Sequence, residues 1–356
     1  MRVRSASHAG SWYTSDGSKL NKALEEWLGA VRGEQVPPPH AVHEEQREGS
    51  SSSSSSAGGG VPVPVPGCRA IIAPHAGYSY SGPAAAWAYR CIDTSGIKRV
   101  FVLGPSHHVY LDGCALSICD EYETPIGALP LDKPILKELA GTGHFSEMSL
   151  QTDEDEHSIE MHLPYIRKVF EKQDITIVPI LVGSISTAKE AHFGKVLAPY
   201  LRDPANLFII SSDFCHWGSR FSYTYYQPPD SAPTNLSSRS GPSPSCPIHT
   251  SIRALDGRGM LAITHPHTAE SEGKGEKTAT QAHEEFAAYL RETRNTVCGR
   301  HPIGVLLGAL AALEQQGGGE GEVRSECRFT RYEQSSACVS VRDSSVSYAS
   351  AFVRFL

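Results

Sequence analysis

Several side chains that can bind metal ions or transfer protons lie just after or just before apolar stretches of this sequence. They are His75, His107, His108, Asp213, His216 and Cys298, with Trp12 as a candidate for the wall of a binding pocket. Two neutral imidazoles and one anionic ligand suit a transition metal that keeps open coordination positions. A carboxylate as the anion gives the facial triad of non-haem iron oxygenases, and a thiolate also suits copper. Residue types and spacing identify these side chains as candidates, but they do not show which of them would bind the metal.

Buried strands must deliver these side chains to a common place. The run from Val100 to Leu103 is typical of a strand buried on both faces, and Gly104-Pro105 indicates a turn at its carboxyl end. The apolar stretch 68–74 ends in the same way, just before His75. In open α/β sheets ligands bind at the carboxyl ends of the strands. We therefore expect the candidate residues at one rim of a sheet.

Four of the candidates carry alternatives that the sequence leaves open. Asp213 and His216 follow a strand that begins at 206, and either form a carboxylate–imidazole pair or leave Asp213 to cap the next turn. Cys298 precedes an apolar helix predicted over 303–316, whose field would lower the thiol pKa, unless the thiol is buried and inert. Trp12 either fills the core or forms a pocket wall.

The acidic stretch 151–164 contains two more histidines, His157 and His162. We interpret its acids as helix caps and its histidines as buried structural residues, with a contact to the site as the secondary alternative. The spacing is not that of HExxH, which excludes a zincin.

The order of predicted elements indicates an α/β fold. Strands are expected at 68–74, 100–103, 175–182, from 206, 328–337 and 345–353, and helices at 18–30, 83–91, up to about 201, 251–263, 283–292 and 303–316. We expect a single domain over 1–356. Low-hydrophobicity segments at 33–67, which includes Ser50 to Ser56, 228–248 and 265–282 predict disordered insertions.

Composition excludes several classes of protein. A net charge of −7 without a Lys/Arg cluster argues against a nucleic-acid partner. The longest apolar run, 303–313, is too short to span a bilayer. The 9 cysteines include no CxxC pair, and no secretory signal is apparent, so we expect reduced thiols in the cytoplasm.

Ordered motifs across the chain closely resemble the Memo family, the mediator of cell motility proteins. These motifs are SHAGSWY (7–13), APHAGY (73–78), LGPSHH (103–108), QTDEDEHSIEMHLPY (151–165), SSDFCHWG (211–218), CGRHPIGVLL (298–307) and DSSVSYA (343–349). The resemblance covers nearly all of the chain outside the three predicted insertions.

The resemblance implies a fold and a set of residue roles. The fold would be one α/β/α domain with a central mixed sheet, similar to class III extradiol (LigB-type) non-haem iron dioxygenases. His75, His107 and Cys298 would be the metal ligands. Asp213 and His216 would be the catalytic groups behind them, and Trp12 and His108 would shape the pocket. Cys298 stands where the dioxygenases have a glutamate, so ring-cleaving activity is not expected.

Two hypotheses about function follow from the resemblance. The first is a metal-dependent redox protein that binds iron or copper and is linked to reactive oxygen species, iron homeostasis and cell motility signalling. The second is a non-enzymatic adaptor that binds phosphotyrosine peptides of receptor tyrosine kinases in the same cleft. A structural zinc site is a third alternative. A cytoplasmic or nuclear location would suit these roles, and the sequence indicates no substrate, turnover or oligomeric state.

Overall fold

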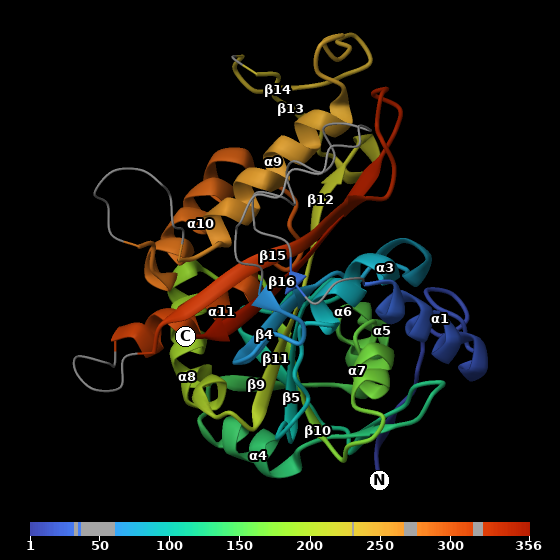
Figure 1. The fold of residues 1–356 in the computed structure, drawn as a ribbon, viewed down its shortest axis with the longest axis vertical. Coiled ribbons are helices and arrows are strands. Elements are labelled where there is room, and N and C mark those ends of the chain that lie inside the picture. The colour runs from blue at the N-terminus through green and yellow to red at the C-terminus, as the bar shows by residue number, and fades with distance from the viewer. Residues whose placement is uncertain (32–34, 37–60, 230, 267–275, 316–322) are drawn as a thin grey trace.

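Four parallel strands form the middle of a nine-stranded mixed sheet in the computed structural model (Figure 1), which describes residues 1–31, 35–36, 61–229, 231–266, 276–315 and 323–356. In spatial order they are β4 (Cys68–Ala73), β11 (Asn206–Ser211), β5 (Arg99–Pro105) and β10 (Thr176–Val182). Their residues are largely apolar and almost all are buried, as expected for strands covered on both faces. Because the four strands run in one direction, their carboxyl ends meet at one edge.

The remaining strands extend this sheet on both sides and make it mixed. β6 (Cys114–Ser117) pairs antiparallel with β10 and is followed by β9 (Phe145–Met148). On the other side, β16 (Ser345–Phe355) pairs antiparallel with β4, with β12 (Asp213–Trp217) and with β15 (Ser325–Gln334). The predicted α/β class with a central mixed sheet is confirmed.

Short strands form separate small sheets. β1 (Val3–Arg4), β7 (Glu121–Tyr122) and β8 (Leu129–Pro130) form one, β13 (Tyr225–Tyr226) and β14 (Thr234–Asn235) another, and β2 (Gln35–Val36) and β3 (Val61–Pro62) a third.

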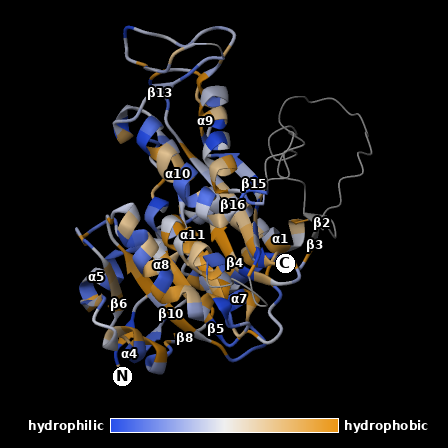
Figure 2. Cartoon of the chain, turned by 90° about the vertical axis from the view of Figure 1, so that its left-hand side faces the viewer, coloured by the Kyte–Doolittle hydropathy of each residue, from blue (hydrophilic) through white to orange (hydrophobic). Residues whose placement is uncertain are grey.

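Helices cover both faces of the central sheet. α8 (Thr187–Arg202) and α11 (Arg300–Gln315) pack together against β11 and, for α11, also against β5. α3 (Tyr78–Tyr89) covers the other face over β4 and β16, and α1 (Gly17–Ala30) lies against α3. Figure 2 shows that apolar residues concentrate on the sheet and on α11, so the core lies between these layers.

The other helices surround this core. They are α4 (Lys133–Gly141), α5 (Leu150–Asp155), α6 (His157–Glu160), α7 (Leu163–Val169), the 3₁₀ turn η1 (Ser219–Phe221), α9 (Ile248–Ile263) and α10 (Ala279–Thr293). α9 and α10 pack against each other, and α10 also packs against α11. No described helix has the length and apolar composition that crossing a membrane requires.

Two predicted boundaries differ from the structure. β5 continues through Gly104 and Pro105, which remain in register with β10, so the expected turn begins only at Ser106. Gly104 is suited to this position because an added Cβ would lie 2.5 Å from the hydroxyl oxygen of Ser158. The predicted helix 83–91 begins earlier, at Tyr78, and contains Pro83 within its length.

The three predicted insertions lie partly outside the described residues. Of 33–67, residues 33–34 and 37–60 fall outside, whereas Val65 is buried and its N–H donates to the carbonyl of Cys91. The segment 228–248 is described apart from residue 230, and Leu236 and Cys246 in it are buried. Of 265–282, residues 267–275 fall outside, and the described remainder includes the start of α10. Each segment therefore contributes residues that pack on the domain.

Candidate metal site

The carboxyl edge of the central sheet brings three of the predicted residues together. His75 follows β4, His107 follows β5, and Cys298 precedes α11. One possible ligand atom from each residue lies within 4.8 Å of those of the other two. His75 Nε2 is 3.2 Å from Cys298 Sγ, close to the roughly 3.5 Å that separates nitrogen and sulfur ligands of one tetrahedral ion. The donor set therefore fits a metal ion with two imidazoles and one sulfur.

A buried serine determines the tautomer of His75. The Ser211 hydroxyl donates to the carbonyl of Ser158 at 2.7 Å, and its oxygen lies 2.6 Å from His75 Nδ1. Since a hydroxyl has one hydrogen, the oxygen must accept from the Nδ1–H of His75. His75 Nε2 then carries the free lone pair and faces Cys298. Burial, together with the neighbouring His107, holds the pKa of His75 well below its ordinary value, so the ring is neutral.

Glu156 orients His107 in the same way. Its carboxylate accepts from His107 Nδ1–H at 2.8 Å and from the His107 backbone N–H at 2.7 Å. A carboxylate that orients a histidine through Nδ1 leaves Nε2 available as a ligand. Burial alone would raise the pKa of Glu156, but the hydrogen bonds and charge of His107 outweigh it and lower the pKa to about 2.

The surroundings of Cys298 distinguish the two alternatives that the sequence left open for its thiol. The sulfur accepts from the backbone N–H of Asp213 at 3.2 Å, and Cys298 lies directly before the N-terminal end of α11. These donors favour the thiolate, but burial raises the pKa well above its ordinary value, and the Asp213 carboxylate raises it further. Of the two alternatives for Cys298, the structure agrees with the buried thiol, because burial outweighs the helix field. Metal binding would have to displace the thiol proton.

Asp213 and His216 lie beside these residues but do not form the carboxylate–imidazole pair that was one of the alternatives. Asp213 accepts from the backbone N–H of His75 at 2.9 Å. The Nδ1–H of His216 instead donates to the carbonyls of Phe214 and Thr296, at 2.9 and 3.1 Å. His216 Nε2 is therefore free, and Asp213, His216 and Cys298 make a second group with ligand atoms within 4.8 Å.

Trp12 and His108 lie at the margin of the site. The Trp12 ring is 36% exposed, so it does not fill the core. Its centroid is 4.3 Å from that of His157, which in turn stacks on His107 at 4.5 Å. The exposed His108 meets the same His157 ring edge-on at 6.0 Å. Both predicted pocket residues thus reach the ligand group through His157.

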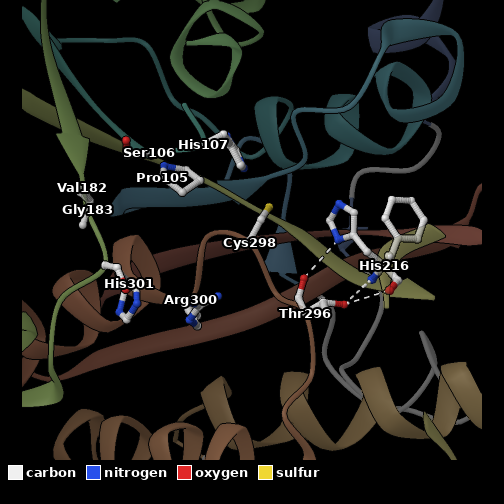
Figure 3. A pocket seen from close by; sticks show the side chains of 12 residues that line it. Pro105, Ser106, His107, Val182, Gly183, His216, Thr296, Cys298, Arg300 and His301 are labelled. Carbon is white, nitrogen blue, oxygen red and sulfur yellow. Dashed lines mark hydrogen bonds between the residues drawn. The ribbon is translucent and has the colours of Figure 1, made fainter. Parts of the chain in front are cut away.

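A cavity of about 340 Å³ opens beside the candidate ligands. Its lining includes His107, His216 and Cys298, together with Thr296, Arg300 and His301. In the view of Figure 3 the Cys298 sulfur lies between the side chains of His107 and His216, and Arg300 and His301 lie away from His216. His75 and Asp213 are buried behind this surface. A small molecule in the cavity would contact the metal ligands from one side.

Sequence reasoning missed Glu156 as part of this site and gave a contact of His157 with it only as the secondary alternative. Glu156 does cap α6, since it accepts from the Ser158 N–H at 2.9 Å, so the capping interpretation holds locally. The same carboxylate also reaches His107, which lies 49 residues earlier in the chain. His157 is largely buried, and its ring lies between those of Trp12 and His107. His162, the other alternative, instead contacts the hydroxyl of Tyr89 at 2.8 Å.

Several known proteins are similar to this chain along nearly its whole length. Protein MEMO1 of Xenopus laevis is 46% identical over 348 residues, which cover 97% of this chain and 95% of that protein. Protein MEMO1 of Homo sapiens is 44% identical with the same coverage. Protein memo-1 homolog of Caenorhabditis elegans is 40% identical over 98% of this chain and 81% of its own.

A solved structure and a family model complete the comparison. The crystal structure of the uncharacterized protein JW3007 from Escherichia coli K12 covers 79% of this chain and 98% of its own, with a TM-score of 0.41 and 15% identity. The model of the family described as Memo-like protein matches residues 4–352. With this match and identities of 40–46% to three relatives, the chain belongs to the Memo family.

Proposed function

We propose that this protein binds an iron or copper ion through His75 Nε2, His107 Nε2 and Cys298 Sγ and acts as a redox protein. The observation that carries the proposal is the convergence of these three donors, whose ligand atoms lie within 4.8 Å of one another. Ser211 and Glu156 occupy the Nδ1 atoms of the two histidines, so both rings present a lone pair toward the sulfur. A coincidental cluster would not require two such oriented rings.

The donor types suit copper, iron and zinc. Imidazole suits iron, copper and zinc, and a thiolate is a soft ligand that suits copper and zinc. A bound iron or copper ion would supply one-electron chemistry, such as transfer of an electron from the reduced ion to dioxygen to give superoxide. Zinc with two histidines, one cysteine and water remains the non-redox alternative. We do not propose ring cleavage, because Cys298 replaces the glutamate of the dioxygenases and a thiolate is itself oxidisable.

The residues around the donors have distinct tasks in this proposal. His216, with Nδ1–H held by two carbonyls, offers Nε2 to accept or return a proton in the cavity. Asp213 holds the backbone of His75 and donates its own N–H to the Cys298 sulfur. The His157 ring stacks on His107, and Trp12 packs against His157, so the two rings form one wall beside the candidate ligand.

The state of the cysteines supports the proposed cellular location. All 9 cysteines are free thiols, which suits a reducing compartment such as the cytoplasm or nucleus. There the protein would act in iron homeostasis, in the production of reactive oxygen species and in motility signalling.

Metal analysis after anaerobic purification tests the proposal. We expect iron or copper in the wild-type protein, and an affinity for Fe(II) or Cu(I) that falls at least about a hundred-fold in Cys298→Ala and in His107→Ala. Cys246→Ala is the control, since this buried cysteine lies in the segment before α9, away from the candidate ligands. Metal content in Cys298→Ala equal to that of the wild type would contradict the ligand assignment. Zinc as the only bound metal would contradict the redox role.

A phosphotyrosine-binding adaptor is the second candidate. It is favoured by Arg300, which lines the same cavity and has no ion-pair or side-chain hydrogen-bond partner among the described residues. A guanidinium group without a carboxylate partner suits a phosphate ligand. Calorimetry with a phosphorylated receptor-tail peptide and its unphosphorylated form tests this candidate, and absence of binding to both at high micromolar concentration would exclude it.

A further inference from the structure

A second cavity, of about 330 Å³, lies next to the candidate metal site on the side of α8, α10 and α11. It is bordered by the first residues of α8, the last residues of α10 and the first residues of α11. Arg300 and His301 line both cavities, whereas Arg291 and Arg294 line only this one. Phe286 and Leu290 of α10 give it an apolar wall. It is a concave site of a size that suits a small molecule.

The charges around this cavity are positive. Arg291, Arg294 and Arg300 have no ion-pair or side-chain hydrogen-bond partner within the described part of the chain. Glu292, the neighbour of Arg291, does not compensate for them, because it pairs with Arg258 at 2.7 Å. Three guanidinium groups around one cavity are unexpected in a chain with a net charge of −7.

Two histidines hydrogen-bond the carboxylate that lines the cavity. Glu190 accepts from His301 Nδ1–H at 2.7 Å through one oxygen and from His283 Nε2–H at 3.0 Å through the other. Among the described lining residues it is the only carboxylate. Both of its oxygens are thus engaged, and the three guanidinium groups remain available to a ligand.

His301 is oriented by Glu190. Its Nδ1–H donates to Glu190, so its Nε2 atom carries a lone pair, and that atom is buried without a hydrogen-bond partner among the described residues. Because this nitrogen is closed to solvent, it does not count among the groups that would hold a ligand in the cavity. The oxygens of a phosphoryl group would instead accept from the guanidinium groups.

The helices that border the cavity add to its affinity for anions. α8 and α11 are each 16 residues long, and both begin here, at Ser186-Thr187 and at Arg300. The free N–H groups of a helix start favour a negative charge. α10 ends here, and its negative pole gives Arg291 and Arg294 an alternative role, in which they only compensate the helix dipole. Substitution of both arginines separates the two roles.

We propose that this cavity binds a small molecule that carries a phosphoryl group, held by Arg291, Arg294 and Arg300. The volume of about 330 Å³ favours a small phosphorylated molecule over a phosphorylated peptide. This proposal goes beyond the metal site and is independent of which metal, if any, is bound there.

Isothermal titration calorimetry of the chelator-treated full chain with pyrophosphate tests the proposal. We expect saturable binding that weakens about ten-fold or more in the double variant Arg291→Gln/Arg294→Gln, because two charge-assisted contacts are lost. Arg202→Gln is the matched control, since Arg202 is an exposed arginine at the far end of α8. The control and Cys298→Ala should both bind within two-fold of the wild type, which separates this cavity from the metal site.

Several results would overturn the proposal. They are no saturable binding at millimolar pyrophosphate, an equal loss of affinity in Arg202→Gln, and loss of binding in Cys298→Ala. Unchanged pyrophosphate affinity in the double variant, with a lowered thermal unfolding temperature, would assign the arginines to the helix dipole alone. Binding of a phosphotyrosine peptide without binding of pyrophosphate would overturn the small-molecule assignment.

Discussion

Three histidines at the sheet edge donate their Nδ1–H groups to three different kinds of acceptor. His75 donates to a serine oxygen, His107 to a carboxylate and His216 to two backbone carbonyls. In each ring the lone pair is thereby confined to Nε2. At the scale of single residues, the candidate site is thus defined by these acceptors as well as by the ligands themselves.

The carboxylate of Glu156 allows the first prediction. In Glu156→Gln the His107 ring loses a negatively charged acceptor, and one neutral amide oxygen must serve both of its donors. We expect metal affinity to fall about ten-fold or more, as is typical when a partner of a ligating histidine is removed. Competition with a chromogenic chelator measures the affinity. Glu147→Gln, at an exposed position of β9, should bind like the wild type, and equal affinities in both variants would contradict the role of Glu156.

The hydroxyl of Ser211 allows a second prediction. Ser211→Ala leaves the buried Nδ1–H of His75 without an acceptor, which costs about 1–3 kcal/mol of stability and releases the ring orientation. Ser350→Ala is the control, because Ser350 is equally buried in the same sheet and donates to the Ala84 carbonyl. We expect both variants to lose stability in urea unfolding and only Ser211→Ala to lose metal affinity. A parallel loss in the control would assign the effect to folding.

At the scale of elements, close contact between α8 and α11 positions Cys298. Gly194 of α8 faces α11 so closely that an added Cβ would lie 2.4 Å from the backbone nitrogen of Ala309. Gly299, directly after Cys298, is equally constrained, since its added Cβ would lie 2.2 Å from the carbonyl oxygen of Ser211. The thiol is therefore held by backbone packing on both sides of the start of α11.

This packing predicts opposite effects for two glycine substitutions in helices. Gly194→Ala must separate α8 from α11, and we expect a loss of about 2 kcal/mol or more in the free energy of unfolding. Gly29→Ala in α1 meets nothing within 4 Å, so the better helix propensity of alanine should stabilise the protein by up to about 1 kcal/mol. Urea unfolding of both variants measures the difference. A neutral Gly194→Ala would show that the two helices can move apart.

At the scale of the whole molecule, a buried charge network joins the N-terminus to the segment that carries Glu156. Arg4 is fully buried and contacts Glu160 at 2.7 Å and Asp153 at 3.1 Å. Glu160 also accepts from His8 and Tyr13. Because removal of one partner leaves a buried charge uncompensated, the network makes folding of the two segments interdependent.

The network predicts how stability depends on pH. Burial alone would raise the pKa of Glu160, but the His8 hydrogen bond and the Arg4 charge outweigh it and lower the pKa to about 2, from 4.5 in the unfolded chain. An acid with a lowered pKa stabilises the folded state above the unfolded value and loses that contribution as the pH falls from 4.5 towards 2. The shift corresponds to about 3 kcal/mol.

Glu160→Gln tests this dependence. Urea unfolding between pH 3 and pH 6 should give a stability difference from the wild type that shrinks as the pH falls, since protonation removes the same charge that the substitution removes. Glu26→Gln, on the exposed side of α1, should differ from the wild type by a small and constant amount. A pH-independent difference for Glu160→Gln would contradict the lowered pKa.

Much of the fold could be predicted from the order of residues along the chain. Short apolar runs rich in β-branched residues, such as Val100 to Leu103, correspond to buried strands, whereas the longer run 303–313 forms the buried helix α11. The resemblance to the family also implied that His75, His107 and Cys298 are the metal ligands. Small differences remained, such as the extension of β5 through Pro105, since strand ends depend on the neighbouring strand.

The remaining properties arise from contacts between distant parts of the chain. The acids before His157 were explained as helix caps by local spacing, and nothing local indicated that Glu156 would also bind His107. For Cys298, the sequence left open whether the helix that follows lowers the thiol pKa or the thiol is buried. Its burial beside Asp213 depends on how β12 and α11 pack, and this burial raises the pKa instead. Local patterns thus predict the strands, the helices and the candidate residues of a site. Ring orientation, burial and charge state depend instead on packing between segments that are far apart in the sequence, which no local pattern contains.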